Sequence, residues 1–266
     1  VLGSWGAAWW LNGGSLKQST GLSWTYDKDS AYPVLSATGL SSAESWEQVG
    51  EALEYDLLKD MEQPAGDGNT NPYQIQTAEQ LAWFAKQVNL SQASSTLSAK
   101  MTTNMDLSGL PYTGYTSAEV MADITKALVW VPISEYMGGV NRFYTGTFDG
   151  DGHYVTNMYA IGESYQGFFS MTGSRAGSSA VIKNFGVKSG KVTRPAGRIG
   201  GSDAGIAAWA QGKNVVFQRC WNGALIESGR YGAGIVGVWN AQDSLIEDCY
   251  NVGEVKGKDS SGGIVG

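Results

Sequence analysis

The chain has 266 residues and a formal net charge of −7, which argues against nucleic acid or an anionic membrane surface as its partner. No apolar run approaches 18 residues, so the sequence contains no candidate membrane-spanning helix. Charged residues make up 16% of the chain, and its length suffices for a sizeable core in one or two domains.

The N-terminal region contains two short, aromatic stretches that resemble strands, "GAAWWLNGG" and "LSWTYDKDSAYPVLS". We interpret the residues before the linker as a separate N-terminal fragment. Residues 41–66 are predicted to be a linker. Within the linker, apolar side chains recur every three to four residues over 44–61, which predicts an acidic amphipathic helix.

The main domain is predicted to span residues 67–266 and to begin with a strand at "PYQI". The next letters, "TAEQ", form a capping box, which marks the start of a helix over 77–89. Apolar residues then recur at i, i+3, i+4 and i+7 from Leu81, so this helix has one apolar face. We expect the helix to cover one end of the domain.

The second half of the chain is repetitive, with a constant interval between equivalent residues. Gly205, Gly234 and Gly263 are evenly spaced, and each precedes an isoleucine. Upstream of each glycine, "VIKNFGVKSGKV", "VFQRCWNGALI" and "LIEDCYNVGEV" resemble one another. The first repeat is longer, and we place its extra residues in "RPAGRIGGSD" at 194–203.

A looser copy precedes these repeats. We align "YVTNMYAIG" at 154–162 with "IKNFGVKSG" at 182–190, and "GFFS" at 167–170 takes the place of Gly-Ile-Val-Gly. The sequence therefore contains about four repeat units, as expected of an array whose loops vary in length.

The predicted fold class is mainly β, a right-handed parallel β-helix with an N-terminal capping helix. A period of roughly 30 that is rich in Gly, Val and Ile, without helical spacing, favours coils of three short strands joined by turns. Successive coils would pair about 4.8 Å apart. The alternative is a propeller, whose blades need about 40–45 residues, and the shorter interval between these repeats argues against it.

Stacked coils would place equivalent residues in columns. Ile206, Ile235 and Ile264 are predicted to form one buried column. Cys220 and Cys249 are separated by the same interval as these isoleucines. We favour two stacked, buried thiols over a disulfide, because parallel side chains hold their Cβ atoms slightly beyond the usual bridging distance.

Strand alternation defines a candidate binding face. If the cysteines point inward, Trp221 and Tyr250 point outward and lie one above the other. Exposed aromatic pairs bind sugars or protein partners, whereas the alternative is that these rings pack under a loop. Trp239 is a third candidate ligand-binding residue. Asn222 and Asn251 are expected to form an amide ladder with a structural role.

The sequence offers little support for catalysis. Its single histidine, His153, lies in the turn-forming stretch "DGDGHY", where a structural role is expected. Polysaccharide lyases and glycosidases also use β-helices, and a glycosidase needs two suitably spaced carboxylates. The candidate carboxylates are Asp203, Glu227, Asp243 and Glu247. All four lie in or beside predicted turns, so we predict no catalytic residue.

No metal or other cofactor is predicted. The sequence lacks the HExxH and CxxC motifs that are typical of zinc sites. Two loops, one with Asp149 and Asp151 and one with Asp67, Asn69 and Asn71, lack the remaining EF-hand ligands. We interpret both as Asx-type turns, and loosely bound calcium is the alternative.

Several stretches occur in the order found in a known family. "NPYQIQTAEQLAWFAKQVN", "TTNMDLSG", "FYTGTFDGDGHYVTNM", "IEDCYNVGEV" and "GGIVG" resemble the GLUG-motif repeat proteins, large bacterial surface proteins. The resemblance covers residues 67–266 and implies secretion, cell-surface attachment, and adhesion or host contact. It also implies that residues 1–40 are the end of an upstream repeat unit, since Leu11–Asn12 and Tyr32–Leu35 match stretches that are usual there. It supplies no catalytic residue. Because solenoids need capped ends, we expect the native chain to continue beyond residue 266.

The sequence thus predicts a non-catalytic, monomeric module of an extracellular repeat protein on a bacterial surface. Its expected ligand is a host glycoprotein, a glycan or an immunoglobulin. A purely structural spacer and a carbohydrate-active enzyme are the alternative functions.

Overall fold

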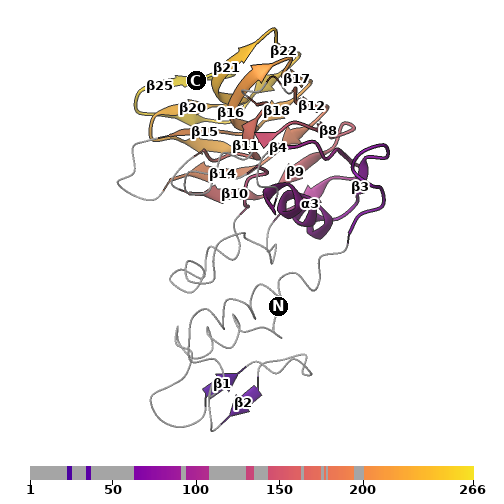
Figure 1. Cartoon of the computed structure of the whole chain (residues 1–266). Coiled ribbons are helices and arrows are strands. Elements are labelled where there is room, and N and C mark those ends of the chain that lie inside the picture. Colours follow the sequence, from indigo (N-terminus) through magenta and orange to yellow (C-terminus); the bar gives the residue numbers. More distant parts are fainter. Residues whose placement is uncertain are drawn as a thin grey trace. The chain divides into compact units, whose positions relative to one another are not determined.

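The computed structural model describes the chain in several ranges, which are 23–25, 34–36, 63–90, 94–107, 130–134, 143–162, 165–174, 177, 179–194 and 201–266 (Figure 1). The chain divides into two compact units. One unit comprises Val1–Met61 and Pro111–Leu128, and the other comprises Glu62–Leu110 and Val129–Gly266.

The first unit contains one antiparallel strand pair, formed by β1 (Ser23–Thr25) and β2 (Val34–Ser36). Both strands fall in the stretch "LSWTYDKDSAYPVLS", whose pattern predicts strands. The helix predicted over 44–61 lies outside the described residues.

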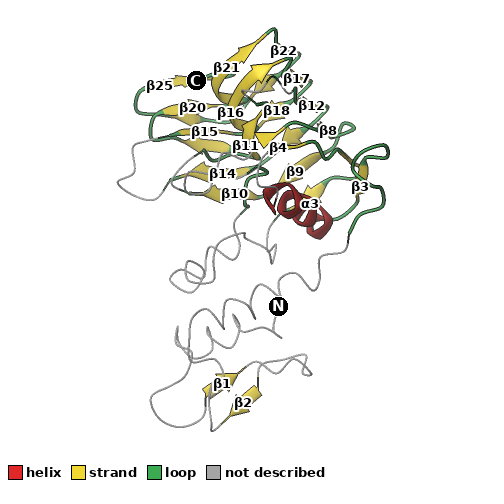
Figure 2. Ribbon diagram, in the orientation of Figure 1, coloured by secondary structure: helices red, strands yellow, loops and turns green. Residues whose placement is uncertain are grey.

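The second unit is built from parallel strands that pair from one coil to the next in five sheets (Figure 2). Sheet I contains β3 (Tyr73–Ile75), β5 (Ala99–Met101), β8 (Thr147–Asp149), β12 (Val181–Lys183), β17 (Val216–Gln218) and β22 (Leu245–Glu247). Sheet II contains β6 (Met105–Asp106), β9 (Tyr154–Thr156), β13 (Gly186–Val187), β18 (Trp221–Asn222) and β23 (Tyr250–Asn251).

The remaining three sheets contain the strands that follow sheets I and II along the chain. Sheet III contains β10 (Met158–Ile161), β14 (Gly190–Thr193), β19 (Leu225–Glu227) and β24 (Val255–Lys256). Sheet IV contains β15 (Ser202–Ala204), β20 (Tyr231–Ala233) and β25 (Ser260–Gly262). Sheet V contains β4 (Ser94–Ser95), β7 (Phe143–Tyr144), β11 (Phe169–Thr172), β16 (Ala207–Lys213) and β21 (Val236–Gln242).

The predicted stacking of parallel strands is confirmed, but the prediction of three strands per coil is wrong. Residues 216–242 form one coil of five strands, β17 to β21, and β22 then re-enters sheet I. The chain bends after only two or three residues because the corner between sheets I and II holds left-handed residues. These residues are Asn184, Arg219 and Asp248, with φ angles of 54°, 52° and 52°.

The strand register confirms the constant interval and the position of the longer repeat. Ser202 pairs with Tyr231, and Tyr231 pairs in turn with Ser260 at the same interval. Lys191, in the strand before Ser202, pairs with Leu225, and this interval is longer. The extra residues therefore lie between β14 and β15, within 194–203 as predicted.

The looser copy is confirmed in one half and wrong in the other. Phe169 pairs with Ala207, so "GFFS" does occupy the position of the later Gly-Ile-Val-Gly. Tyr154, however, pairs with Gly186 and not with Ile182. The predicted alignment of 154–162 was therefore out of register.

The predicted isoleucine column is confirmed. Ile206 and Ile235 are fully buried, and Ile264 is half-buried in the last coil. The backbone N–H of Ala207 donates to the carbonyl of Ile235 at 2.9 Å, and that of Ile235 donates to the carbonyl of Ile264 at 3.2 Å. Ile235 therefore has a coil on each side.

The capping helix is confirmed as α3 (Ala78–Leu90). The hydroxyl of Thr77 accepts a hydrogen bond from the backbone N–H of Gln80 at 3.2 Å, as a capping box requires. Phe84, on the buried face of α3, lies 6.2 Å from both Tyr144 and Phe148 between ring centroids. The helix thus covers the core at one end of the strand stack (Figure 2).

The inward columns of sheet II also follow the prediction. Cys220 is buried, Cys249 is half-buried, and both thiols are free. The side-chain amide of Asn222 donates to Oδ1 of Asn251 at 2.8 Å, which confirms the amide ladder. Over the described ranges, no helix is long and apolar enough to cross a lipid bilayer.

Candidate functional site

Three aromatic side chains form a column on the outer face of sheet II. Tyr154, Trp221 and Tyr250 come from β9, β18 and β23. The ring centroids of Tyr154 and Trp221 are 5.8 Å apart, and those of Trp221 and Tyr250 are 5.9 Å apart. The Trp221 and Tyr250 ring planes are nearly parallel, at an angle of 3°. We call these three residues the aromatic column.

A glycine allows the column to be continuous although β13 lies between β9 and β18. Gly186 pairs with Tyr154 on one side and Trp221 on the other. An ideal Cβ at Gly186 would lie 2.1 Å from Cε2 of Trp221. The indole therefore lies over Gly186, in space that any other side chain would occupy, and this brings it close to Tyr154.

The outward orientation predicted for Trp221 and Tyr250 is confirmed. The neighbours of Trp221 along the strand, Cys220 and Asn222, are fully buried. Tyr250 is 52% exposed, and Trp221 is half-buried between Tyr250 and the preceding coils. Their role in ligand binding stays a prediction.

A surface pocket of about 400 Å³ adjoins the column at the corner between sheets I and II. It is lined by Asp151, Gly152, Asn184, Arg219 and Trp221. The Nε–H of Arg219 donates to Oδ1 of Asn184 at 2.7 Å, and the Asn184 amide donates to Oδ1 of Asp149 at 2.8 Å. These bonds hold the Arg219 side chain at the wall of the pocket.

A second cation lies at the other border of the column. Lys188 is exposed and follows β13. Its Nζ lies 4.8 Å from the centroid of the Tyr154 ring and 3.4 Å from the Tyr154 hydroxyl. The column therefore combines aromatic faces with hydrogen-bonding and cationic groups.

Trp239, the third candidate, is not part of this face. It lies on β21 of sheet V, in register with the fully buried Ala210. Its ring contacts that of the buried Phe217, with the centroids 6.2 Å apart. The structure thus brings Trp221 and Tyr250 together and places Trp239 elsewhere.

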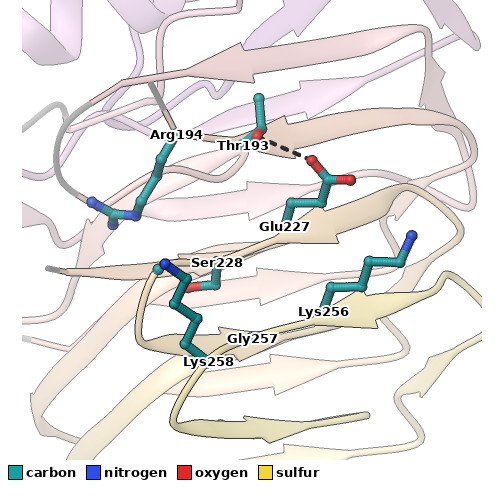
Figure 3. A pocket seen from close by; sticks show the side chains of 8 residues that line it. Thr193, Arg194, Glu227, Ser228, Lys256, Gly257 and Lys258 are labelled. Carbon is teal, nitrogen blue, oxygen red and sulfur yellow. Dashed lines mark hydrogen bonds between the residues drawn. The ribbon is translucent and has the colours of Figure 1, made fainter. Parts of the chain in front are cut away.

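A second pocket, of about 310 Å³, lies at the turns between sheets III and IV and contains one of the four candidate carboxylates, Glu227 (Figure 3). Thr193 donates to Oε2 of Glu227 at 3.4 Å, and Lys191 forms an ion pair with the same oxygen at 2.7 Å. The Lys191 ammonium is the main cause that lowers the pKa of Glu227. The remaining lining residues are Arg194, Ser228, Gly229, Lys256, Gly257 and Lys258.

Asp203 is fully buried in the middle of β15 and does not line this pocket, so its predicted place in or beside a turn is wrong. Its carboxylate forms an ion pair with Arg194 at 2.5 Å and accepts a hydrogen bond from Ser228 at 2.8 Å. Burial raises the pKa of Asp203, and the Arg194 guanidinium opposes that shift. Arg194 directly follows β14 and Asp203 lies on β15, so this buried ion pair links the two ends of the longer turn.

Of the other two candidate carboxylates, Asp243 lies in the turn between β21 and β22 and Glu247 is the last residue of β22, beside a turn, as predicted. Asp243 has a left-handed φ of 50°, and Glu247 accepts a hydrogen bond from the Gln218 amide. Of the two pockets, one is lined by a single carboxylate, Asp151, and the other by Glu227 alone.

The acidic loops form Asx-type turns, as predicted. Asp67 accepts hydrogen bonds from the backbone N–H groups of Asn69 and Asn71 at 2.7 and 2.9 Å. These bonds and one from the Thr70 hydroxyl hold the pKa of Asp67 well below its usual range. Asp149 accepts from the backbone N–H of Asp151 at 2.9 Å.

Within the described ranges, no group of three or more His, Cys, Asp or Glu side chains could hold a metal ion. The histidine closes a turn through its backbone, because the N–H of His153 donates to the carbonyl of Gly150 at 2.8 Å.

Sequence reasoning missed Tyr154, Lys188 and Arg219 as members of this face. The error in the alignment placed Tyr154 opposite Ile182 instead of Gly186. A signal was present, since a glycine opposite a tryptophan in the next repeat leaves room for a second ring to approach. Arg219 and Lys188 carry no pattern that separates them from other surface cations.

Comparisons with known proteins do not identify a family. No family model matches the chain, and no curated protein matches it. Among solved structures, the chain is similar to a candidate immunoglobulin A1 protease from Bacteroides ovatus, with a TM-score of 0.44 and 18% sequence identity. The match covers 77% of this chain and 65% of that chain, less than two thirds of its length. A TM-score below 0.5 does not establish a shared fold.

Proposed function

We propose that this chain is a non-catalytic binding module of a secreted bacterial cell-surface repeat protein, and that its aromatic column binds a glycan. The observation that carries the proposal is the column itself, formed by Tyr154, Trp221 and Tyr250 next to a polar pocket. The resemblance to GLUG-motif repeat proteins supports the extracellular setting.

The chemistry of the face favours a sugar over an apolar ligand. Aromatic rings bind the apolar face of a sugar ring, and a polar rim can satisfy its hydroxyls. The rim here consists of Arg219, Asn184 and Asp151, which together offer donors and acceptors in fixed positions. A host glycoprotein, such as an immunoglobulin, would present such a glycan.

The stacked sheets provide the rigid support that such a face needs. We infer that the five sheets close into a right-handed β-helix. The fixed order in which each coil visits the sheets and the right-handed preference of parallel crossovers support this inference.

A carbohydrate-active enzyme is less well supported than a binding module. A glycosidase needs two carboxylates that flank the scissile glycosidic bond at a set separation. Glu227 is engaged by Lys191, and Asp203 is buried against Arg194. These contacts favour binding over hydrolysis, and a purely structural spacer is the remaining alternative.

The test is glycan binding by the purified protein and by a Trp221→Ala/Tyr250→Ala variant. We expect the wild type to bind members of a glycan array and the variant to lose that binding while its unfolding transition stays cooperative. Tyr159→Ala is the matched control, because Tyr159 is an exposed tyrosine on sheet III, outside the column. Absence of wild-type binding would favour the spacer, and unchanged binding by the double variant would exclude this face.

A further inference from the structure

The aromatic column is bordered by a cation on each side. Arg219 stands at the corner between sheets I and II, and Lys188 stands just after the strand of sheet II. Both side chains are exposed, in a chain whose net charge is −7. Two exposed cations beside one group of aromatic rings are unusual in a chain with this negative charge, so we asked what they contact.

The nearby acidic groups are largely neutralised by other partners. Asp149 pairs with Lys183 at 3.2 Å, and Asp151 pairs with Lys100 at 3.0 Å. Across the ranges that the structure describes, neither Arg219 nor Lys188 forms an ion pair.

Two acidic residues of the next coil lie at the same corner. Asp248 occupies the position of Arg219 in that coil, and Glu247 precedes it. Neither carboxylate forms an ion pair with Arg219 or Lys188 in the described part of the chain, so both cations can still contact an anionic group of a ligand.

The column also has a direction. Its three rings belong to strands of one sheet, so the column runs along the direction in which the coils stack. The centroids are 5.8 and 5.9 Å apart, a spacing comparable to one sugar residue in an extended chain. A linear saccharide that lies across the coils can therefore place successive sugars over successive rings.

We infer that the ligand of the aromatic column is a linear, acidic saccharide that runs across the coils. Its sugar rings stack on Tyr154, Trp221 and Tyr250, and its carboxylate or sulfate groups lie beside Arg219 and Lys188. This inference rests on the proposed function, and it adds the charge and the shape of the glycan. Anionic groups gain affinity and association rate from cations that form no ion pair within the protein.

The first experiment compares matched oligosaccharides by calorimetry. Hyaluronan hexasaccharide supplies carboxylates only, chondroitin sulfate hexasaccharide supplies carboxylates and sulfates, and carboxyl-reduced hyaluronan is the neutral control. We expect an acidic hexasaccharide to bind more tightly than its reduced form, and a disaccharide to bind more weakly than either acidic hexasaccharide. The preference for the acidic form should shrink as salt is added, because exposed charges are screened.

The second experiment removes the two cations. Arg219→Asn keeps a residue that tolerates the left-handed corner, as Asn184 does in the preceding coil. Combined with Lys188→Gln, it should weaken the acidic hexasaccharide about fivefold to tenfold more than it weakens the neutral one, because only the acidic form loses an ionic contact. Lys213→Gln removes an exposed lysine at the end of β16 in sheet V and should change neither affinity.

The outcomes separate this inference from the proposed function. Equal affinity for acidic and neutral hexasaccharides, with binding lost in Trp221→Ala/Tyr250→Ala, would overturn the acidic ligand and keep the glycan face. Equal affinity for disaccharide and hexasaccharide would overturn the extended binding mode. If neither the acidic nor the neutral saccharides bind, the acidic ligand is wrong, and the glycan array then decides whether the column binds another glycan.

Discussion

At the scale of single residues, the asparagine ladder explains two of the three evenly spaced glycines, Gly205 and Gly234. An ideal Cβ at Gly205 would lie 2.2 Å from Oδ1 of Asn222, and one at Gly234 would lie 2.3 Å from Cγ of Asn251. The asparagine of the following coil therefore fills the space beside the glycine. Since the amide also bonds the turn after it, the two positions are coupled.

The glycine requirement gives a stability prediction. Gly234→Ala should lower the free energy of unfolding by about 1–3 kcal/mol, because the new methyl group overpacks a buried site. Gly263→Ala is the matched control in the last coil, where a Cβ has no heavy atom within 4 Å. Urea denaturation gives the free energy of unfolding of both variants. Equal stability of the two would show that Asn251 does not require a glycine at position 234.

The thiols of the inner column should differ in reactivity. A hydrogen bond from Cys220 lowers the pKa of Cys249 to about 7, while the same interaction and burial raise the pKa of Cys220. Since the thiolate is the nucleophile, alkylation of native protein should occur at Cys249 and accelerate as pH rises through 7. Mass spectrometry should then find two labelled cysteines after unfolding without reductant. No labelling at that stage would mean a disulfide.

At the scale of elements, α3 stabilises the end of the coil stack through its buried face. Phe84→Ala should reduce the free energy of unfolding by about 3–5 kcal/mol, because it leaves a cavity against Tyr144 and Phe148. Leu90 is 60% exposed at the end of the same helix, so Leu90→Ala should change the free energy of unfolding by no more than about 0.5 kcal/mol. Thermal unfolding measures both, and a small loss for Phe84→Ala would argue against a capping role.

The elements also show what the sequence could and could not predict. The helix was predictable because Thr77 and Gln80 cap it and its apolar spacing is regular. The number of strands per coil was not, because corners such as Arg219 and Asp248 adopt left-handed angles without glycine. Their side chains carry no strong signal for that conformation.

At the scale of the whole molecule, the coil register was predictable only where the repeat is regular. From Ser202 onward the step between coils is constant, so the glycine, isoleucine and cysteine columns could be aligned by sequence. In the earlier coils the step varies, and Tyr154 was misaligned. The face that contains Tyr154, Arg219 and Lys188 therefore emerged only from the structure.

Stacked coils predict a large loss of stability when a charge is buried between them. Ile235→Asp should cost about 3–5 kcal/mol, because the unpaired carboxylate has a coil on each side. Ile264→Asp places the same group in the last coil, where the side chain is half-buried, and should cost less. A wild-type unfolding midpoint for Ile235→Asp would contradict the stacked arrangement.

The central claim is that the aromatic column binds a saccharide along the direction of coil stacking. The most direct measurement is the structure of this protein in complex with an acidic hexasaccharide. The account predicts sugar rings against Tyr154, Trp221 and Tyr250, with an anionic group beside Arg219 or Lys188. A saccharide bound at another face, or one that contacts a single ring and leaves the column, would contradict it.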